Sequence, residues 1–278
     1  MNKKSFGNKL IACPYIVWAA IFIIVPLIIM VYFALTDANG VFTLANLASL
    51  GRYKKAFAIS VIYAVIATVI TLALAYPMAY FMTKLKISSQ RMIMMIVMLP
   101  MWMNFLIRTY SWITILANTG IINTLLGKIG IGPLKLINTP GAVILGMVYD
   151  FIPYMILPIY SVMSKIDNSL LEASEDLGAN SFNKVKKVIF PLSRPGVISG
   201  ITMVFVPSVS TFYISQKLGG GSFDLIGDVI ERQFQQSYNY NLGASISFVL
   251  MILIVVSTLI MNRYTDDDEN TAAGGFMA

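Results

Sequence analysis

The chain has 278 residues, of which 57% are hydrophobic and 12% are charged, and its mean hydropathy is +0.75. A soluble globular chain carries about 25% charged residues, so this composition predicts a membrane protein. The formal net charge is +7, but no basic stripe with interleaved aromatics occurs, which argues against nucleic acid as a partner. The chain has no His and a single Cys, Cys13, which excludes a structural zinc site, an internal disulfide and His-based acid–base chemistry.

Six segments are long and apolar enough to cross about 30 Å of hydrocarbon as helices. They are residues 11–35, 56–83, 91–117, 141–163, 197–217 and 242–262. The first segment exceeds the roughly 7–15 apolar residues of a signal peptide, and no small-residue cleavage site follows it, so we expect a retained helix. The pattern predicts an all-α polytopic membrane protein with about six transmembrane helices, spanning residues 11–263 between a short N-terminus, residues 1–10, and a flexible tail, residues 264–278.

The lysines and arginines in the connections predict the orientation of the chain in the membrane. One side holds twelve of them, namely Lys3, Lys4, Lys9, Lys84, Lys86, Arg91, Lys165, Lys184, Lys186, Lys187, Arg194 and Arg263. The other side holds seven, namely Arg52, Lys54, Lys55, Lys128, Lys135, Lys217 and Arg232. The positive-inside rule therefore predicts that both termini and the loop 164–196 are cytoplasmic.

The loop 164–196 is polar and charged between two apolar segments, and its pattern predicts a helical hairpin. Ser169 and Glu172 fit the S-x-x-E capping box of a first short helix, and Gly178 stands where a left-handed helix end favours glycine. Ser181 is expected to cap a second short helix, which Pro191 would stop. Such a hairpin in a membrane chain indicates contact with a soluble partner; the alternative is a solvated hairpin without one.

This loop resembles the EAA motif of ABC-importer permeases. The motif reads E-A-A, three residues, G, and later a hydrophobic residue with L-P; here it reads Glu172-Ala173-Ser174, Gly178 and Ile189-Phe190-Pro191. Ser174 and Phe190 depart from the motif, but the spacing is kept. Residues 90–262 are also similar to spermidine/putrescine permeases of the PotB type, as in Leu99-Pro100-Met101-Trp102 and Leu242-Gly243-Ala244.

The resemblance implies the type I ABC importer permease (MetI-like) fold in a bacterial inner (plasma) membrane. It implies four kinds of partner: a homologous second permease, a homodimer of cytoplasmic ATPase subunits that binds ATP and Mg, an extracytoplasmic polyamine-binding protein and the lipid bilayer. The residues expected to couple the chain to the ATPase are Glu172, Ala173, Ser174, Leu177, Gly178 and Pro191. The chain itself is expected to be no enzyme and to bind no cofactor, because the phosphate-binding pattern G-x-x-x-x-G-K-[ST] is absent from it.

Two alternatives remain open at the level of the sequence. The same machinery could carry another cargo, namely thiamine, an opine or ferric iron. A self-contained channel or ion-coupled carrier is a different class of protein, and it typically needs several intramembrane acids or broken helices.

Arg108 and Asp150 are the clear ionisable residues inside predicted spans, and such residues are functional candidates. Each lies about nine residues from the outer end of its span, which places both about 13–14 Å deep and allows them to pair. The pair is either a structural salt bridge, or Asp150 meets an ammonium of the substrate in a water-filled path. The candidates for that path are Tyr110, Trp112, Asp150, Phe151, Tyr154 and Tyr213, whose aromatic members can face a cation or simply pack and anchor the helices.

Three smaller patterns complete the analysis. Residues 118–140 contain apolar residues at the spacing of a short amphipathic helix at the outer interface. Gly196 and Gly200 form a G-x-x-x-G pattern, which either admits a close helix or occurs by chance. The acidic residues Asp224, Asp228 and Glu231 could steer cations or dock the binding protein, or they are solvated surface charges.

Overall fold

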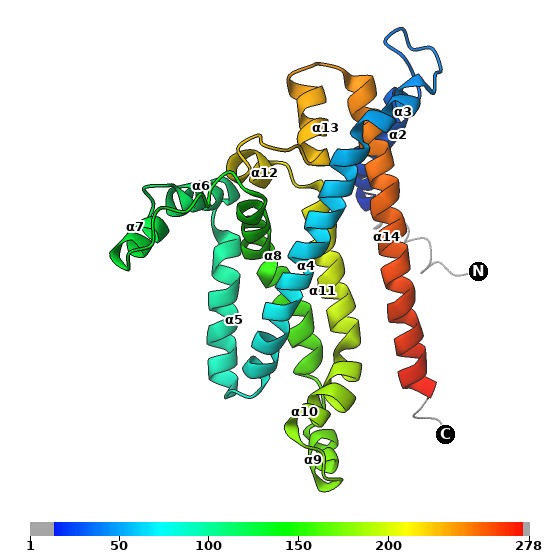
Figure 1. The fold of residues 1–278 in the computed structure, drawn as a ribbon. Helices are drawn as coiled ribbons and strands as arrows, with labels where there is room; N and C mark the ends of the chain where they lie inside the picture. Colours follow the sequence, from blue (N-terminus) through cyan, green and yellow to red (C-terminus); the bar gives the residue numbers. More distant parts are fainter. Residues whose placement is uncertain (1–13, 275–278) are drawn as a thin grey trace, which may run out of the picture. The chain divides into compact units, whose positions relative to one another are not determined.

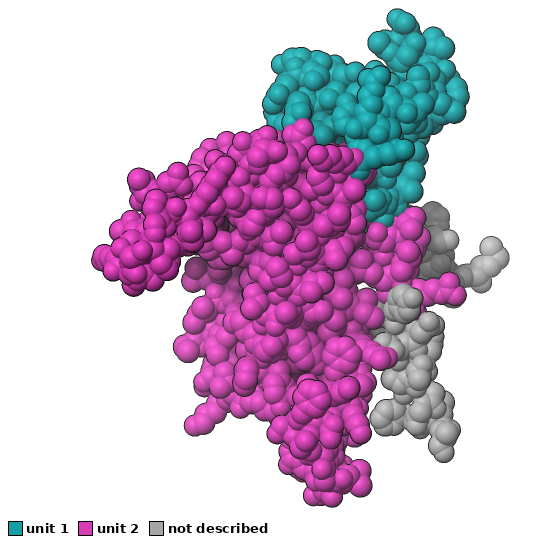
Figure 2. Space-filling view, viewed as in Figure 1, with its two compact units in different colours: residues 1–54, 229–253 teal, residues 55–228, 254–278 magenta. Residues whose placement is uncertain are grey.

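The computed structural model describes residues 14–274, and it describes side-chain surroundings for residues 14–263. Cys13 and the basic residues of the N-terminus lie outside the described residues, as do residues 275–278. The described part of the chain is almost entirely helical, and its only extended pairing is an isolated bridge between Thr36 and Phe42. The chain divides into two compact units, residues 1–54 with 229–253 and residues 55–228 with 254–278 (Figure 2).

The first unit joins the N-terminal helices to the start of the last helix. Its helices are α2 (Val25–Ala34), preceded by a π-helical turn (Ala20–Ile24), then α3 (Ala45–Ser49), the 3-10 turn Leu50–Tyr53, most of α13 (Ile226–Gln235) and the first part of α14 (Tyr240–Gly274). The side-chain amide of Asn241 donates to the carbonyl of Thr36 over 2.8 Å. The hydroxyl of Ser245 donates to the carbonyl of Ala34 over 2.9 Å. These bonds from α14 satisfy the carbonyl of the last residue of α2, which the helix itself leaves unpaired, and one carbonyl just beyond it.

The second unit holds most of the helices of the described chain (Figure 1). They are α4 (Lys54–Thr83), α5 (Ile87–Trp102), α6 (Phe105–Leu116), α7 (Ile121–Lys128), α8 (Pro140–Met163), α9 (Asn168–Asp176), α10 (Ser181–Lys184), the π-helical turn Val185–Ile189, α11 (Phe190–Ser210) and α12 (Tyr213–Leu218). The helix α7 lies within residues 118–140, where the sequence predicts a short amphipathic helix.

Among the described residues, five helices are long and apolar enough to cross a membrane, and a bent pair of helices brings the number to six. The five are Pro14–Ala34, Ala45–Thr83, Pro140–Met163, Ser181–Ser210 and Tyr240–Arg263. The bent pair is Ile87–Trp102 with Phe105–Lys128, which meet at 92°. The expectation of an all-α fold with about six spans is therefore confirmed. The continuous span predicted at 91–117 is wrong, because the chain turns sharply inside it.

Local backbone chemistry explains this turn. Met103 is extended, with φ −76° and ψ 148°, and the following residue, Asn104, caps α6. The Oδ1 atom of Asn104 accepts the backbone N–H of Leu106 over 2.8 Å and that of Ile107 over 3.4 Å. An N-cap side chain of this kind starts a new helix. The mean hydropathy of the segment does not reveal this helix start, because the residues on both sides of Asn104 are apolar.

The fifth predicted span, 197–217, also differs from the structure at both ends. The helical run begins at Ser181 and ends at Ser210, where Thr211 becomes extended, and the separate helix α12 follows. The run passes straight through Pro191, so the prediction that this proline stops a helix is wrong. In the π-helical turn before it, the N–H of Phe190 bonds to the carbonyl of Val185. A π turn adds one residue to the helical turn and so accommodates the missing N–H and the bulk of a proline ring.

Small residues let the helices of the second unit approach closely. A Cβ atom added to Gly196 would lie 2.7 Å from the carbonyl oxygen of Pro158, and one added to Gly200 would lie 2.6 Å from the sulfur of Met155. The G-x-x-x-G pattern therefore faces α8, and α11 packs along that helix. The buried side of α4 is also mostly small, with Ala64, Ala67, Ala75 and Ala79 all fully buried.

The last helix is longer than its apolar segment. Its candidate span ends at Arg263, but α14 continues to Gly274 and so covers most of residues 264–278. The flexibility of that tail stays a prediction.

Candidate functional site

The hairpin between α8 and α11 is built from α9 and α10, and its first helix is capped by a residue that the sequence analysis missed. Asp167 is the N-cap, and its Oδ1 atom accepts the backbone N–H of Ser169 over 2.9 Å. Ser169 is therefore the second residue of α9 and not its cap, as the capping-box pattern had predicted. The bond from the Ser169 N–H, assisted by the Ser169 hydroxyl, lowers the pKa of the Asp167 carboxyl below its usual value of 3.8.

The end of α9 is shaped by Gly178. This residue has φ +79°, in the left-handed region that favours glycine. Its N–H bonds to the carbonyl of Glu175 over 2.8 Å, and the N–H of Ala179 bonds to the carbonyl of Ser174 over 3.0 Å. Together these two bonds form a Schellman motif, which closes the helix and sets the direction of the chain into the next one.

The second arm of the hairpin starts at Asn180. Its Oδ1 atom accepts the N–H of Asn183 over 2.8 Å, so Asn180, and not Ser181, caps α10. Lys184 of α10 forms an ion pair with Glu175 of α9. The two caps, the glycine turn and this ion pair hold the arms of the hairpin together.

One face of the hairpin is open to solvent in this chain, and Figures 1 and 2 show the hairpin projecting from the second unit beyond α8 and α11. Leu177 is 89% exposed and Phe182 is 71% exposed, although both are large and apolar. Glu172 and Ala173 are also exposed, whereas Ser174 is buried, with its hydroxyl bonded to the carbonyl of Leu171 over 2.7 Å. Exposed apolar side chains on a polar hairpin are typical of a protein–protein contact.

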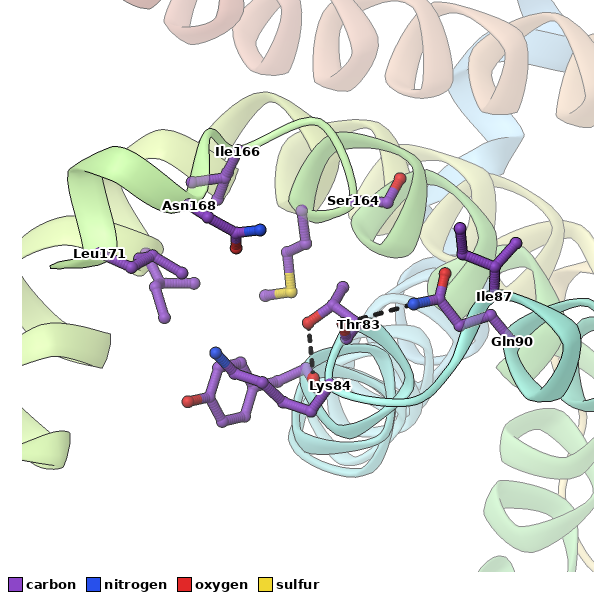
Figure 3. A pocket seen from close by; sticks show the side chains of 11 residues that line it. Thr83, Lys84, Ile87, Gln90, Ser164, Ile166, Asn168 and Leu171 are labelled. Carbon is purple, nitrogen blue, oxygen red and sulfur yellow. Dashed lines mark hydrogen bonds between the residues drawn. The ribbon is translucent and has the colours of Figure 1, made fainter.

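A cavity of about 510 Å³ lies at the root of the hairpin (Figure 3). It is lined by Tyr80, Thr83, Lys84, Ile87, Gln90, Met163, Ser164, Ile166, Asn168, Leu171 and Ile189. The side-chain amide of Gln90 bridges this root, donating to the carbonyl of Leu85 over 2.8 Å and to that of Thr83 over 3.4 Å. Its Oε1 atom accepts the hydroxyl of Tyr160 over 2.7 Å, which joins the start of α5 to the end of α8.

Arg108 and Asp150 lie together in the interior of the second unit. The Nε atom of Arg108 is 2.6 Å from Oδ1 of Asp150, and the two side chains are 9% and 3% exposed. The Nη1 atom of Arg108 donates to the carbonyl of Pro100 over 2.7 Å. The guanidinium also lies 5.8 Å from the ring centres of Phe105 and Tyr149. One arginine thus binds the end of α5, the start of α6 and the middle of α8 at the sharp turn.

The structure divides the aromatic candidates into separate groups. Tyr110 and Tyr213 form an edge-to-face pair with ring centres 6.4 Å apart, and Lys217 lies over both rings. Trp112 instead packs edge-to-face against Tyr149, at 5.3 Å, and Phe151 packs against Tyr154, at 6.4 Å. The contact of Lys217 with the tyrosines depends on the turn at Asn104, so residue spacing does not predict it.

Asp228 is not a surface charge. It is buried, and its Oδ1 atom accepts the hydroxyl of Ser215 over 2.8 Å, while Oδ2 accepts the N–H of Leu225 over 2.8 Å. The carboxylate therefore caps the start of α13, three residues ahead of its own position, as in a capping box. Asp224 and Glu231, the other two acidic residues considered for steering cations, docking the binding protein or solvation, are partly exposed.

A family model described as a binding-protein-dependent transport system inner membrane component matches residues 71–267, which include the hairpin and the ion pair. The chain belongs to this family. As an inner-membrane transport component, it has curated relatives that match nearly its whole length. The spermidine/putrescine transport system permease protein PotB of Haemophilus influenzae is 37% identical over 256 residues, covering 88% of this chain and 90% of that protein. The PotB protein of Escherichia coli is 35% identical over 256 residues, covering 88% and 93%.

Solved structures share the fold of this permease at low sequence identity. A bacterial ABC transporter involved in the import of the polysaccharide alginate has a chain with a TM-score of 0.77 and 16% identity, covering 95% of this chain and 96% of that one. The MetNI methionine ABC transporter has one with a TM-score of 0.58 and 16% identity, covering 77% and 94%. The fold is therefore that of ABC importer permeases (MetI-like), as predicted.

Proposed function

We propose that this chain is the transmembrane permease subunit of an ATP-driven importer that moves polyamines, such as spermidine and putrescine, into the cytoplasm. An extracytoplasmic binding protein would deliver the polyamine, and a homologous second permease would complete the path. A pair of cytoplasmic ATPase subunits would bind ATP and Mg and drive the cycle. The observation that carries the proposal is the exposed hairpin with the EAA spacing, in a chain whose relatives include spermidine/putrescine permeases.

The exposed face of the hairpin is the part that would dock on the ATPase. Leu177 and Phe182 supply apolar contact area, and Glu172 adds an exposed charge on α9. Gly178 and Ser174 would act indirectly, since one shapes the turn and the other is buried against the backbone of α9. Apolar anchors of this kind dominate the binding energy of protein interfaces.

The hairpin is placed to pass motion into the membrane. Its second arm runs without a break from Ser181 through Pro191 into α11. That helix packs closely on α8 at Gly196 and Gly200, so a push on the hairpin would move α8 and α11 together. A closely packed helix pair transmits displacement because its interior compresses little. Positive residues of the loop 164–196, among them Lys184, Lys186, Lys187 and Arg194, favour a cytoplasmic position for the hairpin.

The role of Asp150 follows from its partner. Because the carboxylate already faces the Arg108 guanidinium at 2.6 Å, its charge is balanced within the chain. We therefore assign the pair to holding the sharp turn between α5 and α6, and not to binding an ammonium of the cargo. Trp112, Phe151 and Tyr154 stay predicted members of the path.

Reconstitution tests the proposal. The chain is purified with its neighbouring subunits, placed in proteoliposomes and supplied with radiolabelled spermidine and the binding protein. We expect uptake that requires ATP and is reduced by unlabelled putrescine but not by thiamine. If thiamine competes and putrescine does not, the cargo is thiamine and not a polyamine. Uptake driven by an ion gradient without ATP would contradict an ABC importer.

A further inference from the structure

Lys217 lies over the faces of two tyrosines that come from distant parts of the sequence. Its Nζ atom is 5.4 Å from the ring centre of Tyr110 and 5.6 Å from that of Tyr213. We propose that the two rings form a binding site for one ammonium group of the cargo, and that Lys217 occupies this site until the cargo displaces it. This inference rests on the proposed function, because it takes the cargo to be a polyamine.

The site is a product of the two helix breaks. The turn at Asn104 aims α6, which carries Tyr110, and the break after Ser210 starts α12, which carries both Tyr213 and Lys217. The helix α12 packs against α6 and α8. The hairpin joins the start of α11, and α12 follows the end of α11. Figure 1 shows the hairpin and α12 at opposite ends of the second unit. With 21 residues in α11, these ends are about 30 Å apart.

The tyrosine pair is accessible, and further ring contacts connect it to the interior of the unit. Tyr110 is 50% exposed. Tyr213 next contacts Phe105, with ring centres 5.7 Å apart, and the guanidinium of Arg108 lies 5.8 Å from the Phe105 ring. A row of aromatic rings thus leads from the exposed tyrosine to the buried Arg108–Asp150 pair, with one protein cation at each end.

The chemistry of Lys217 matches that of the cargo. A lysine side chain is a primary ammonium on a four-carbon stem, and a polyamine offers ammonium groups on similar methylene chains. Both would contact the tyrosine faces by the same cation–π attraction, which is modest at exposed sites, so either can replace the other. Lys217 keeps the rings arranged for a cation when no cargo is present. When cargo is present, the ammonium of Lys217 and that of the polyamine compete for the same tyrosine faces.

Direct binding tests this exchange. The purified assembly, without its binding protein, is placed in nanodiscs of zwitterionic lipid, and equilibrium dialysis measures the binding of radiolabelled spermidine. We expect Lys217→Met to lower the apparent Kd by about two- to five-fold, because the competing cation is gone. Lys217→Arg keeps a competing cation over the rings and should not lower the Kd. Tyr110→Leu with Tyr213→Leu should raise it. In that double-leucine background, Lys217→Met should have no effect.

A matched control separates the site from general electrostatics. Lys128, on α7, is exposed, whereas Lys217 is half-buried, and Lys128→Met removes the same charge away from the tyrosine pair. An equal decrease of the Kd in Lys128→Met, no change in Lys217→Met, or no saturable binding to the wild type would each overturn the inference. ATP-driven uptake of spermidine by the same wild-type preparation separates this failure from a failure of the proposed function. Uptake without the expected binding effects would overturn only the site at Lys217, whereas absence of ATP-driven uptake would overturn the proposed function.

The reactivity of Lys217 gives a second measurement that does not depend on affinity. An acylating reagent modifies free amines, and mass spectrometry reports the rate at Lys217. Because the amines of spermidine consume the reagent too, the rate at Lys217 is taken relative to that at Lys128 in the same sample. Spermidine should raise this ratio, because the displaced ammonium becomes free, whereas Mg²⁺ at equal charge should not. An unchanged or lower ratio with spermidine would contradict displacement.

Discussion

The hydroxyl of Tyr160 donates a hydrogen bond to Oε1 of Gln90 over 2.7 Å, and this bond joins α8 to the start of α5 at the root of the hairpin. Gln90 also holds the turn between α4 and α5 through the carbonyls of Thr83 and Leu85. Gln90 thus links α4, α5 and α8 at the root of the hairpin.

Tyr160→Phe removes that bond with little change of shape. We expect the unfolding free energy to decrease by about 1 kcal/mol, and the number of substrates moved per ATP to fall, because the root becomes looser. Tyr76→Phe is the matched control, since it removes a similar hydroxyl contact with Ser193, at 3.1 Å, away from the cavity. Equal transport per ATP in wild type and Tyr160→Phe would show that the bond has no part in coupling.

Gly178→Ala is expected to disturb the hairpin through the backbone alone. No atom lies within 4 Å of the added Cβ, so the cost comes from the positive φ of 79° and is about 1–2 kcal/mol. Gly130 has φ +80° and equally open space in the loop after α7. Gly130→Ala should therefore lose similar stability but keep ATP-driven uptake, whereas Gly178→Ala should lose uptake. If both variants transport equally, the turn at Gly178 does not serve coupling.

Breaking the Arg108–Asp150 pair from one side should be costly. Arg108→Met leaves a buried unpaired carboxylate, and we expect a loss of about 3–5 kcal/mol or failure to assemble. The double variant Arg108→Met with Asp150→Leu replaces both charges by apolar groups and should recover most of that stability, measured by thermal unfolding in detergent. Its uptake of spermidine should recover as well. A stable double variant without uptake would instead assign Asp150 to the cargo.

The cap of α9 should weaken in acid. Because the Ser169 N–H lowers the pKa of Asp167 in the folded hairpin, the cap is fully present above the ordinary pKa of 3.8 and is lost as the pH falls through the lowered value. Hydrogen exchange of the first amides of α9 should therefore accelerate, relative to Asp167→Asn, only below about pH 4. Asparagine keeps a capping oxygen that does not titrate. Identical pH profiles in the two proteins would contradict the role of Asp167.

The spans can be predicted from the sequence because each depends on the mean hydropathy of about 20 residues. The breaks within the spans cannot, because each depends on a single residue. The segment 91–117 stays apolar through Asn104, so only the cap chemistry of that side chain reveals the turn. In the hairpin, Gly178 was predictable since its conformation is a local property. Pro191 was not, because a π-helical turn formed ahead of it.

The contacts of the candidate site also separate into those that residue spacing predicts and those that it does not. Depth arithmetic placed Arg108 and Asp150 at one level, and they lie 2.6 Å apart. The contact of Lys217 with Tyr110 and Tyr213 was out of reach, because it needs both helix breaks at once. Contacts that follow from a straight helix can be predicted from spacing, whereas contacts made across a break require the structure.

The central claim is that the hairpin lies in the cytoplasm and docks on an ATPase, and Leu177, the most exposed large apolar side chain of the hairpin, tests it most directly. In a chain with Cys13→Ala, Leu177→Cys is labelled with a membrane-impermeant thiol reagent in intact cells and in inside-out vesicles, with and without the ATPase subunit. The account predicts labelling in the inside-out vesicles alone, and protection when the ATPase is present. Labelling from outside intact cells, or equal labelling with and without the ATPase, would contradict it.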